Sequence, residues 1–215
     1  MKLHTYFRSS AAYRVRIALQ LKGIGYDPAF VHLTRGGGEQ HGPVFRALNP
    51  SELVPVLETD DGAVLSQSLA IIEWLEETHP SPPLLAQDPT TRAQIRAFAL
   101  AIACDIHPLN NLRVLQYLKR NLGQEQATID AWYRHWIGVG LPPLEAILQR
   151  AGGAGPFCFG AEPSLADICL VPQLANARRY ACPLDALPLL LRAEAACRAL
   201  PAFQAAAPEA QPDAA

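Results

Sequence analysis

This chain of 215 residues contains very little lysine, and neither sign of charge is in large excess. Of its 18 lysines and arginines only Lys2, Lys22 and Lys119 are lysines, and with 20 acidic residues the formal net charge is −2. A broad basic face that neutralises nucleic-acid phosphates needs many clustered cations, so the composition argues against a nucleic-acid partner. The 15 arginines leave room for a smaller anion site, because a guanidinium binds a carboxylate through a bidentate fork that an ammonium cannot form.

Long apolar runs and paired cysteines are also missing. No stretch reaches the roughly 18 apolar residues that a membrane-spanning helix needs, and the first residues lead into polar sequence instead of a signal-peptide core. The five cysteines are odd in number and widely spaced, with no C-x-x-C pair and no Cys/His pair at metal-ligand spacing. We therefore expect a cytoplasmic protein with reduced cysteines, no metal and no membrane partner.

The first 78 residues alternate between strand-like and helix-like patterns. Such a β-α-β, β-β-α order predicts a thioredoxin-like α/β domain, which we place at residues 1–80. The hydrophobic spacing and turn residues predict strands over 1–6, 26–33, 54–58 and 63–65, and helices over 11–22 and 68–77.

The rest of the chain has helical periodicity throughout. A proline-rich break predicts a linker at residues 81–90. Beyond it we expect an all-α domain over 91–215, with a loosely held Pro/Ala-rich tail from Pro208. The helical patterns run over 91–121, 126–150, 164–180 and 186–199.

The candidate chemistry begins at Ser9 and Ser10, where the first expected strand turns into a helix. Free backbone N–H groups and the positive end of the helix dipole can stabilise an anion there, and either serine could add a hydroxyl hydrogen bond. The alternative is that a serine simply caps the helix. Because this turn has no cysteine, which a redox thioredoxin needs, any reactive thiol must come from a ligand.

Two further features belong to the same domain. Val54-Pro55 opens an expected strand; a cis peptide bond would expose the Val54 backbone to an extended peptide, whereas a trans proline would merely start the strand. Gln67-Ser68 opens the next expected helix, where Ser68 either binds a ligand carboxylate or caps the helix. With the serine turn, these features indicate a short peptide that carries a free carboxylate and a thiol.

These motifs, taken in order along the chain, resemble the zeta class of the glutathione transferases. The resemblance implies an α/β thioredoxin-like glutathione-binding domain plus an all-α substrate-binding domain (the glutathione transferase fold), and a homodimer. It also implies glutathione-dependent cis–trans isomerisation of a small unsaturated dicarboxylate. The matching segments are Ser9–Leu19, Asn49-Pro50 with Val54-Pro55, Gln67–Glu73, His107–Arg113, the helix with Trp132 and Trp136, and Pro163–Asp167.

Within this class we expect conversion of maleylacetoacetate to fumarylacetoacetate in aromatic amino-acid catabolism. Three alternatives stay open: maleylpyruvate isomerisation, general glutathione conjugation, and a non-catalytic binding module of the same fold. An isomerase leaves the glutathione concentration unchanged, whereas a conjugating enzyme consumes it.

The resemblance also assigns residues. It implies that Ser9 or Ser10 holds the glutathione sulfur. It further implies that Val54, which precedes Pro55 in the same glutathione-binding segment, pairs with the cysteinyl backbone of glutathione, and that Gln67 and Ser68 bind the γ-glutamyl carboxylate. The further glutathione contacts that it implies are Gln40, His107 and Asn111. Many members have cysteine at the position of Ala11, so here stabilisation of the thiolate falls to the serines.

Arginines are the expected partners of the substrate. Arg8, Arg113 and Arg179 match positions where members that handle maleylpyruvate have arginine, and Arg8 also adjoins the serine turn. Their cations would bind the two carboxylates and stabilise the charge that develops on the enol oxygen when a thiolate adds to the double bond. The alternative for each is a solvated surface arginine.

Ser164-x-x-Asp167 is typical of a capping box, for which we expect a role in folding.

Overall fold

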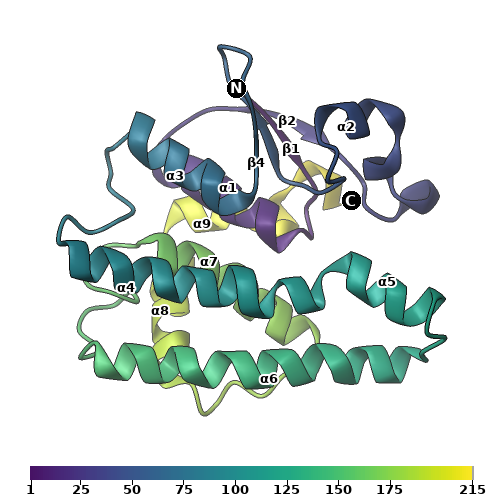
Figure 1. Ribbon diagram of the computed structural model, residues 1–215. Helices are drawn as coiled ribbons and strands as arrows, with labels where there is room; N and C mark the ends of the chain where they lie inside the picture. The colour runs from purple at the N-terminus through teal and green to yellow at the C-terminus, as the bar shows by residue number, and fades with distance from the viewer. Residues whose placement is uncertain (215) are drawn as a thin grey trace. The chain divides into compact units, whose positions relative to one another are not determined.

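A computed structural model describes residues 1–214. The chain forms two compact units: Met1–Pro83 together with the residues from Ala199 onward, and Leu84–Arg198. We describe each unit by itself (Figure 1). No helix within residues 1–214 is both long and apolar enough to cross a membrane.

The first unit is built on a four-stranded mixed sheet in the order β2-β1-β3-β4. β1 pairs in parallel with β2 and antiparallel with β3, which pairs antiparallel with β4. This topology confirms the thioredoxin-like prediction. Its elements are β1 (Lys2–Thr5), α1 (Ser10–Leu21), β2 (Asp27–Phe30), α2 (Pro43–Leu48), β3 (Val56–Glu58), β4 (Val64–Ser66), α3 (Ser68–Thr78) and α9 (Pro201–Ala206).

Apolar side chains cover the sheet of this unit. Helices α1 and α3 contact each other, and the side chains of Val15, Leu57 and Ile71 are fully buried. A second apolar cluster brings Phe45 of α2 together with Val56 of β3. Because successive residues of a strand point to opposite faces, the neighbours Val56 and Leu57 can serve two faces of the sheet.

The strand predicted over 26–33 is shorter in the structure. β2 spans Asp27–Phe30, is an edge strand of the sheet, and pairs only with the four residues of β1. Pro28 lacks an N–H, which an edge strand tolerates. The length of the partner strand, which local sequence does not reveal, therefore limits β2.

The second unit is helical. Helix α7 contacts both α4 and α8, and α8 contacts α6. Its elements are α4 (Pro89–Leu100), a π-helical segment (Ala101–Ile106), a 3-10 turn (Pro108–Asn110), α5 (Leu112–Arg120), α6 (Gln126–Arg150), α7 (Leu165–Arg179) and α8 (Pro188–Arg198).

The single helical pattern expected over 91–121 is interrupted around Pro108. Proline has no N–H, and its ring collides with the carbonyl four residues earlier in a regular α-helix. Before Pro108 the helix is wider than a regular α-helix: His107 N–H donates to the Ile102 carbonyl, five residues back, at 2.9 Å. A π-helical segment followed by a 3-10 turn is the result.

The predicted domain boundaries differ from the structure at both ends of the helical domain. Residues 84–90, expected in the linker, belong to the second unit, since Leu84 is buried and its carbonyl accepts from Leu165 N–H at 2.9 Å. Residues 199–214, expected in the all-α domain, belong to the first unit, where α9 packs on α1 and buries Phe203. The tail expected to be loose forms 3-10 turns at Pro208–Ala210 and Pro212–Ala214.

The capping box at the start of α7 is confirmed. Asp167 is fully buried; its Oδ2 accepts from Ser164 N–H and Oγ–H, both at 2.9 Å, and its Oδ1 accepts from Cys158 N–H at 2.9 Å. Burial raises the pKa of this carboxyl, against the lowering effect of its hydrogen bonds. The arrangement anchors the loop before α7 and indicates a role in folding.

We expect Asp167→Asn to lower the free energy of unfolding by roughly 1–3 kcal/mol, because asparagine replaces one of the two acceptor oxygens with an NH2 group, which cannot accept from the Ser164 donors. Urea denaturation followed by circular dichroism measures the change. Exposed Glu162→Gln, in the same loop, is the control and should leave stability unchanged within about 0.5 kcal/mol. Equal stability of the two variants would contradict a folding role for Asp167.

Candidate functional site

The serine turn joins β1 to α1. Ser9 is the N-cap residue of α1, and its Oγ accepts from Ala12 N–H at 3.2 Å; Ser10 is the first helical residue and is buried. A hydroxyl that accepts through its oxygen keeps its own proton for donation. Capping and anion binding, which the sequence left as alternatives, are therefore compatible in Ser9.

The strand register brings the three N-terminal features to one edge of the sheet. His4 pairs with Val56 in β3, which in turn pairs with Ser66 in β4. The end of β1, the start of β3 and the end of β4 are consequently adjacent. The serine turn, Val54-Pro55 and Gln67-Ser68 extend from these three points.

The chain before β3 is held in a fixed loop. The Val54-Pro55 peptide bond is cis. Both residues are buried, and Asn49 Nδ2 donates to the Leu53 carbonyl at 2.8 Å. The loop thus presents the Val54 backbone immediately before the strand.

Gln67 has an unusual backbone conformation. Its φ of 68° and ψ of 117° are rarely adopted by a residue with a side chain. Gln67 occupies the N-cap position of α3, but its side chain forms no capping hydrogen bond. Such strain is typical of ligand-binding positions, where the surrounding structure maintains it. The exposed Gln67 side chain stands at the helix N-terminus, where an anion is favoured.

Ser68 is oriented by a residue that sequence reasoning did not assign to the site. Arg14 of α1 is only 1% exposed, and its Nη1 donates to Ser68 Oγ at 3.3 Å. The Ser68 hydroxyl accepts this bond and can donate its proton elsewhere. Two arginines among the apolar residues of α1 were the available signal, but only the fold shows that Arg14 reaches α3.

Gln40 is mostly engaged within its own loop. Its Nε2 donates to the Leu33 carbonyl at 3.3 Å, while its buried Oε1 has no hydrogen-bond partner. Gly38, with φ of 113°, leaves the space that this carboxamide occupies: a Cβ there would lie 2.5 Å from Gln40 Nε2. The remaining acceptor suits a ligand N–H group.

In the second unit, His107 and Asn111 flank the 3-10 turn after the π-helical segment. Asn111 is the N-cap residue of α5, and its Oδ1 accepts from Arg113 N–H at 3.1 Å. His107 is half-buried, and Arg113 is exposed in the first turn of α5. The turn therefore brings the predicted Asn111 and Arg113 into one local arrangement.

Arg178 and Arg179, adjacent at the end of α7, have different surroundings. Arg178 forms a two-point ion pair with the buried Glu194, with Nη2–Oε2 at 2.6 Å. Arg179 lies over the Tyr180 ring at 5.6 Å, and Tyr180 stacks on Tyr133 with ring centroids 3.6 Å apart. In the part of the chain that the structure describes, no carboxylate pairs with Arg179, so its charge is available to a ligand.

Arg8, in the first unit, has a comparable arrangement. Its guanidinium lies 4.9 Å from the centre of the Phe7 ring, and the side chain is exposed. Aromatic contacts of this kind hold a cation without neutralising it. Arg8 thus presents a full positive charge one residue before Ser9.

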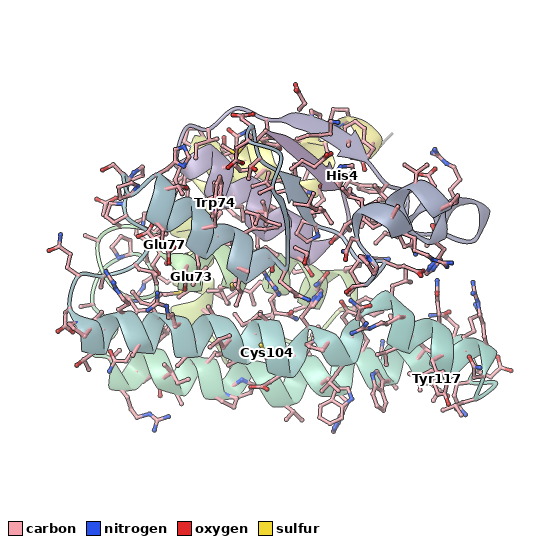
Figure 2. All side chains as sticks on the ribbon, turned by 45° about the horizontal axis from the view of Figure 1, so that its top comes forward. His4, Glu73, Trp74, Glu77, Cys104 and Tyr117 are labelled. Atoms are coloured by element: carbon pink, nitrogen blue, oxygen red, sulfur yellow. The ribbon has the colours of Figure 1, made fainter. Side chains whose placement is uncertain are left out.

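The cysteines of the protein are poor candidates for a nucleophile. All five are free thiols, and burial raises the pKa of Cys158, Cys182 and Cys197. Cys104 is exposed and lies on the π-helical segment, where Figure 2 labels it. Since the serine turn contains no thiol, thiolate chemistry at this turn requires a ligand that carries one.

Comparison with known proteins agrees with this geometry. Residues 8–78 match the family of glutathione S-transferase N-terminal domains, and residues 130–205 match that of the C-terminal domains. A probable maleylacetoacetate isomerase from Vibrio cholerae is 53% identical over 212 residues, with 99% of this chain and 97% of that protein covered.

Two solved structures are similar over the full length of both chains. One is the holo form of a maleylpyruvate isomerase, described as a bacterial glutathione S-transferase of the zeta class, with a TM-score of 0.96 and 47% identity. The other is a maleylacetoacetate isomerase from Methylobacterium extorquens with bound malonate and glutathione, with a TM-score of 0.95 and 40% identity. The chain therefore belongs to the glutathione S-transferase family, within its zeta class.

Proposed function

We propose that this protein is a glutathione-dependent maleylacetoacetate isomerase that forms fumarylacetoacetate. The observation that carries the proposal is the sheet edge on which a thiol-free serine turn adjoins Val54-Pro55 and Gln67-Ser68. The Vibrio cholerae relative named for this activity, and the related structure that holds both glutathione and a dicarboxylate, support it.

The residues present fit glutathione. When bound, glutathione supplies a thiolate whose reversible addition to a conjugated double bond makes rotation about that bond possible. The Ser9 hydroxyl and the first-turn amides of α1 are the donors that favour the charged sulfur. An ordinary thiol has a pKa near 8.5, and lowering it by two units requires roughly 2.7 kcal/mol of preferential stabilisation of the thiolate.

The other contacts orient the peptide. The Val54 backbone is available to pair with the cysteinyl residue as an added strand. Ser68, whose hydroxyl accepts from Arg14, can donate to the γ-glutamyl carboxylate together with the Gln67 amide. We assign Gln40, His107 and Asn111 as further glutathione contacts.

The arginines act on the substrate in this proposal. Arg8, Arg113 and Arg179 supply cations for its two carboxylates and for the negative charge that develops on the enol oxygen. Their side chains are exposed, and a guanidinium forms two parallel bonds to a carboxylate.

A direct assay tests the reaction. Purified protein with glutathione should isomerise maleylacetoacetate while the glutathione concentration stays constant. Turnover of maleylpyruvate alone would overturn the proposal in favour of maleylpyruvate isomerase, the activity named for the structure with a TM-score of 0.96. Stoichiometric loss of glutathione into a thioether would instead indicate a conjugating transferase. The absence of any reaction would indicate a non-catalytic binding module.

We expect Gln67→Gly to separate folding from ligand binding. Glycine accepts a positive φ without strain, so stability should stay the same or rise by up to about 1 kcal/mol. The Kd for glutathione, measured by calorimetry, should rise roughly 10-fold because a carboxamide donor is lost.

The control for this variant is Ala181→Gly, which relieves a positive φ of 53° at an exposed position of the second unit. It should not change glutathione affinity. Equal affinity of Gln67→Gly and the unaltered protein would remove Gln67 from the binding site.

We also propose that the active form is a homodimer, as the resemblance to the zeta class implies. Sedimentation equilibrium should give twice the mass of the chain at micromolar concentration. A monomer that retains full isomerase activity would contradict this.

A further inference from the structure

The loop before the serine turn is held by a buried arginine. Arg16 of α1 is 0% exposed. Its Nη1 donates to Thr5 Oγ1 at 3.0 Å and to the Tyr6 carbonyl at 3.3 Å, and its Nη2 donates to the Phe7 carbonyl at 3.1 Å. One side chain thus holds three consecutive residues, from the last residue of β1 to the residue before Arg8.

The C-terminal segment holds the same loop from another direction. Asp213 Oδ2 accepts from Phe7 N–H at 2.9 Å, although the two residues are 206 positions apart. Arg16 Nε also donates to the Ala206 carbonyl at 3.0 Å. Phe7 is therefore held at its carbonyl by Arg16 and at its amide by Asp213.

Opposite charges support this arrangement. Burial lowers the pKa of Arg16 to about 10, and Asp213 is among the groups that act against this lowering. The guanidinium therefore remains charged near neutral pH. Hydrogen bonds from a charged donor are stronger than those between neutral groups, so the loop is firmly held.

One of the backbone groups that Arg16 binds also forms the serine turn. The Tyr6 carbonyl that accepts from Arg16 accepts from Ser9 N–H as well, at 2.9 Å. A displacement of the Tyr6–Phe7 backbone would consequently move Ser9. Misplacing a catalytic group by about 1 Å can cost roughly 100-fold in rate.

We propose that Arg16 and Asp213 are positioning residues that clamp the loop before Ser9, so that the C-terminal segment is part of the thiolate-stabilising site. This inference rests on the proposed role of Ser9 toward the glutathione sulfur. It gives a functional reason for the docking of residues 206–213 on the first unit.

The test compares three variants of the full chain with bound glutathione. Asp213→Ala removes the acceptor for Phe7 N–H, Asp213→Asn keeps an oxygen that can accept the bond, and Glu209→Ala alters an exposed carboxylate of the same segment. The pKa of the bound glutathione thiol is followed through the ultraviolet absorbance of the thiolate. Turnover of maleylacetoacetate gives kcat and KM in parallel.

The expected result is that Asp213→Ala raises the thiol pKa by about one unit and lowers kcat roughly 10-fold, with little change in the KM for glutathione. Asp213→Asn should recover most of both losses, and Glu209→Ala should match the unaltered protein. An unchanged thiol pKa in Asp213→Ala, an equal change in Glu209→Ala, or no recovery in Asp213→Asn would overturn the clamp. Because the thiol pKa requires no dicarboxylate, a failure of the clamp is distinguishable from a wrong substrate assignment.

Discussion

Replacing Ser9 with alanine is expected to lower kcat/KM for isomerisation roughly 100-fold, as the loss of one donor to a developing or bound anion does in other enzymes. The physical reason is the geometry of its hydroxyl, whose oxygen accepts from Ala12 N–H and whose proton remains to be donated. Ser10→Ala is expected to cost less than about 10-fold, because Ser10 is buried in the first turn of α1. Steady-state kinetics with maleylacetoacetate measure both effects.

The Ser9 variants need a check on folding, since a lost N-cap destabilises a helix by about 1 kcal/mol. Ser9→Thr keeps both the cap and the hydroxyl and should retain most of the activity. The pKa of the bound glutathione thiol should rise in Ser9→Ala and stay low in Ser9→Thr. Normal rates in both alanine variants would remove the serines from the mechanism, and a larger loss in Ser10→Ala would reverse their roles.

Arg179→Ala is expected to lower kcat/KM roughly 100-fold, mainly through a higher KM for the dicarboxylate, because a cation for a substrate carboxylate is lost. Arg179 is suited to this role because it lies over the Tyr180 ring and keeps its charge unpaired within the described residues.

The same steady-state kinetics on Arg113→Ala distinguish binding of a substrate carboxylate from stabilisation of the enolate. A raised KM alone means that Arg113 holds a carboxylate, whereas a lowered kcat means that it stabilises the enolate.

The adjacent Arg178 is the matched control. Removing it leaves the buried Glu194 without its ion-pair partner, so Arg178→Ala should lower the unfolding free energy while the KM of the folded enzyme stays unchanged. If Arg178→Ala raises KM as much as Arg179→Ala, the two arginines do not differ in the way that their surroundings indicate. If neither variant changes KM, the substrate carboxylates are bound elsewhere.

Much of the fold was predictable because its signals are local. The alternation of strand and helix patterns defined the thioredoxin-like unit, and Ser164-x-x-Asp167 predicted the start of α7 from residues only three positions apart. Hydrophobic periodicity likewise located α6 over the predicted residues 126–150. Local patterns were less informative around Pro108, where a π-helical segment replaces the regular helix.

The candidate site was predictable in its residue types but not in its internal organisation. The sequence placed serines at a helix start, and the resemblance selected Arg179, yet neither could show how Arg179 differs from its neighbour Arg178, because the difference depends on Glu194, on another helix, and on the stack of Tyr180 on Tyr133. Nor could it show that Gln67 has a positive φ. These properties depend on packing between elements that are distant in the sequence.

By itself, the sequence determined that the formal net charge is only −2, that the serine turn contains no thiol of its own, and that an α/β unit precedes a helical one. Only the tertiary structure decided that the tail from Ala199 returns to the first unit, where Arg16 and Asp213 reach the loop before Ser9. The reason is physical: caps and periodicity act over a few residues, whereas a hydrogen bond across 190 or 206 positions exists only once the chain has folded.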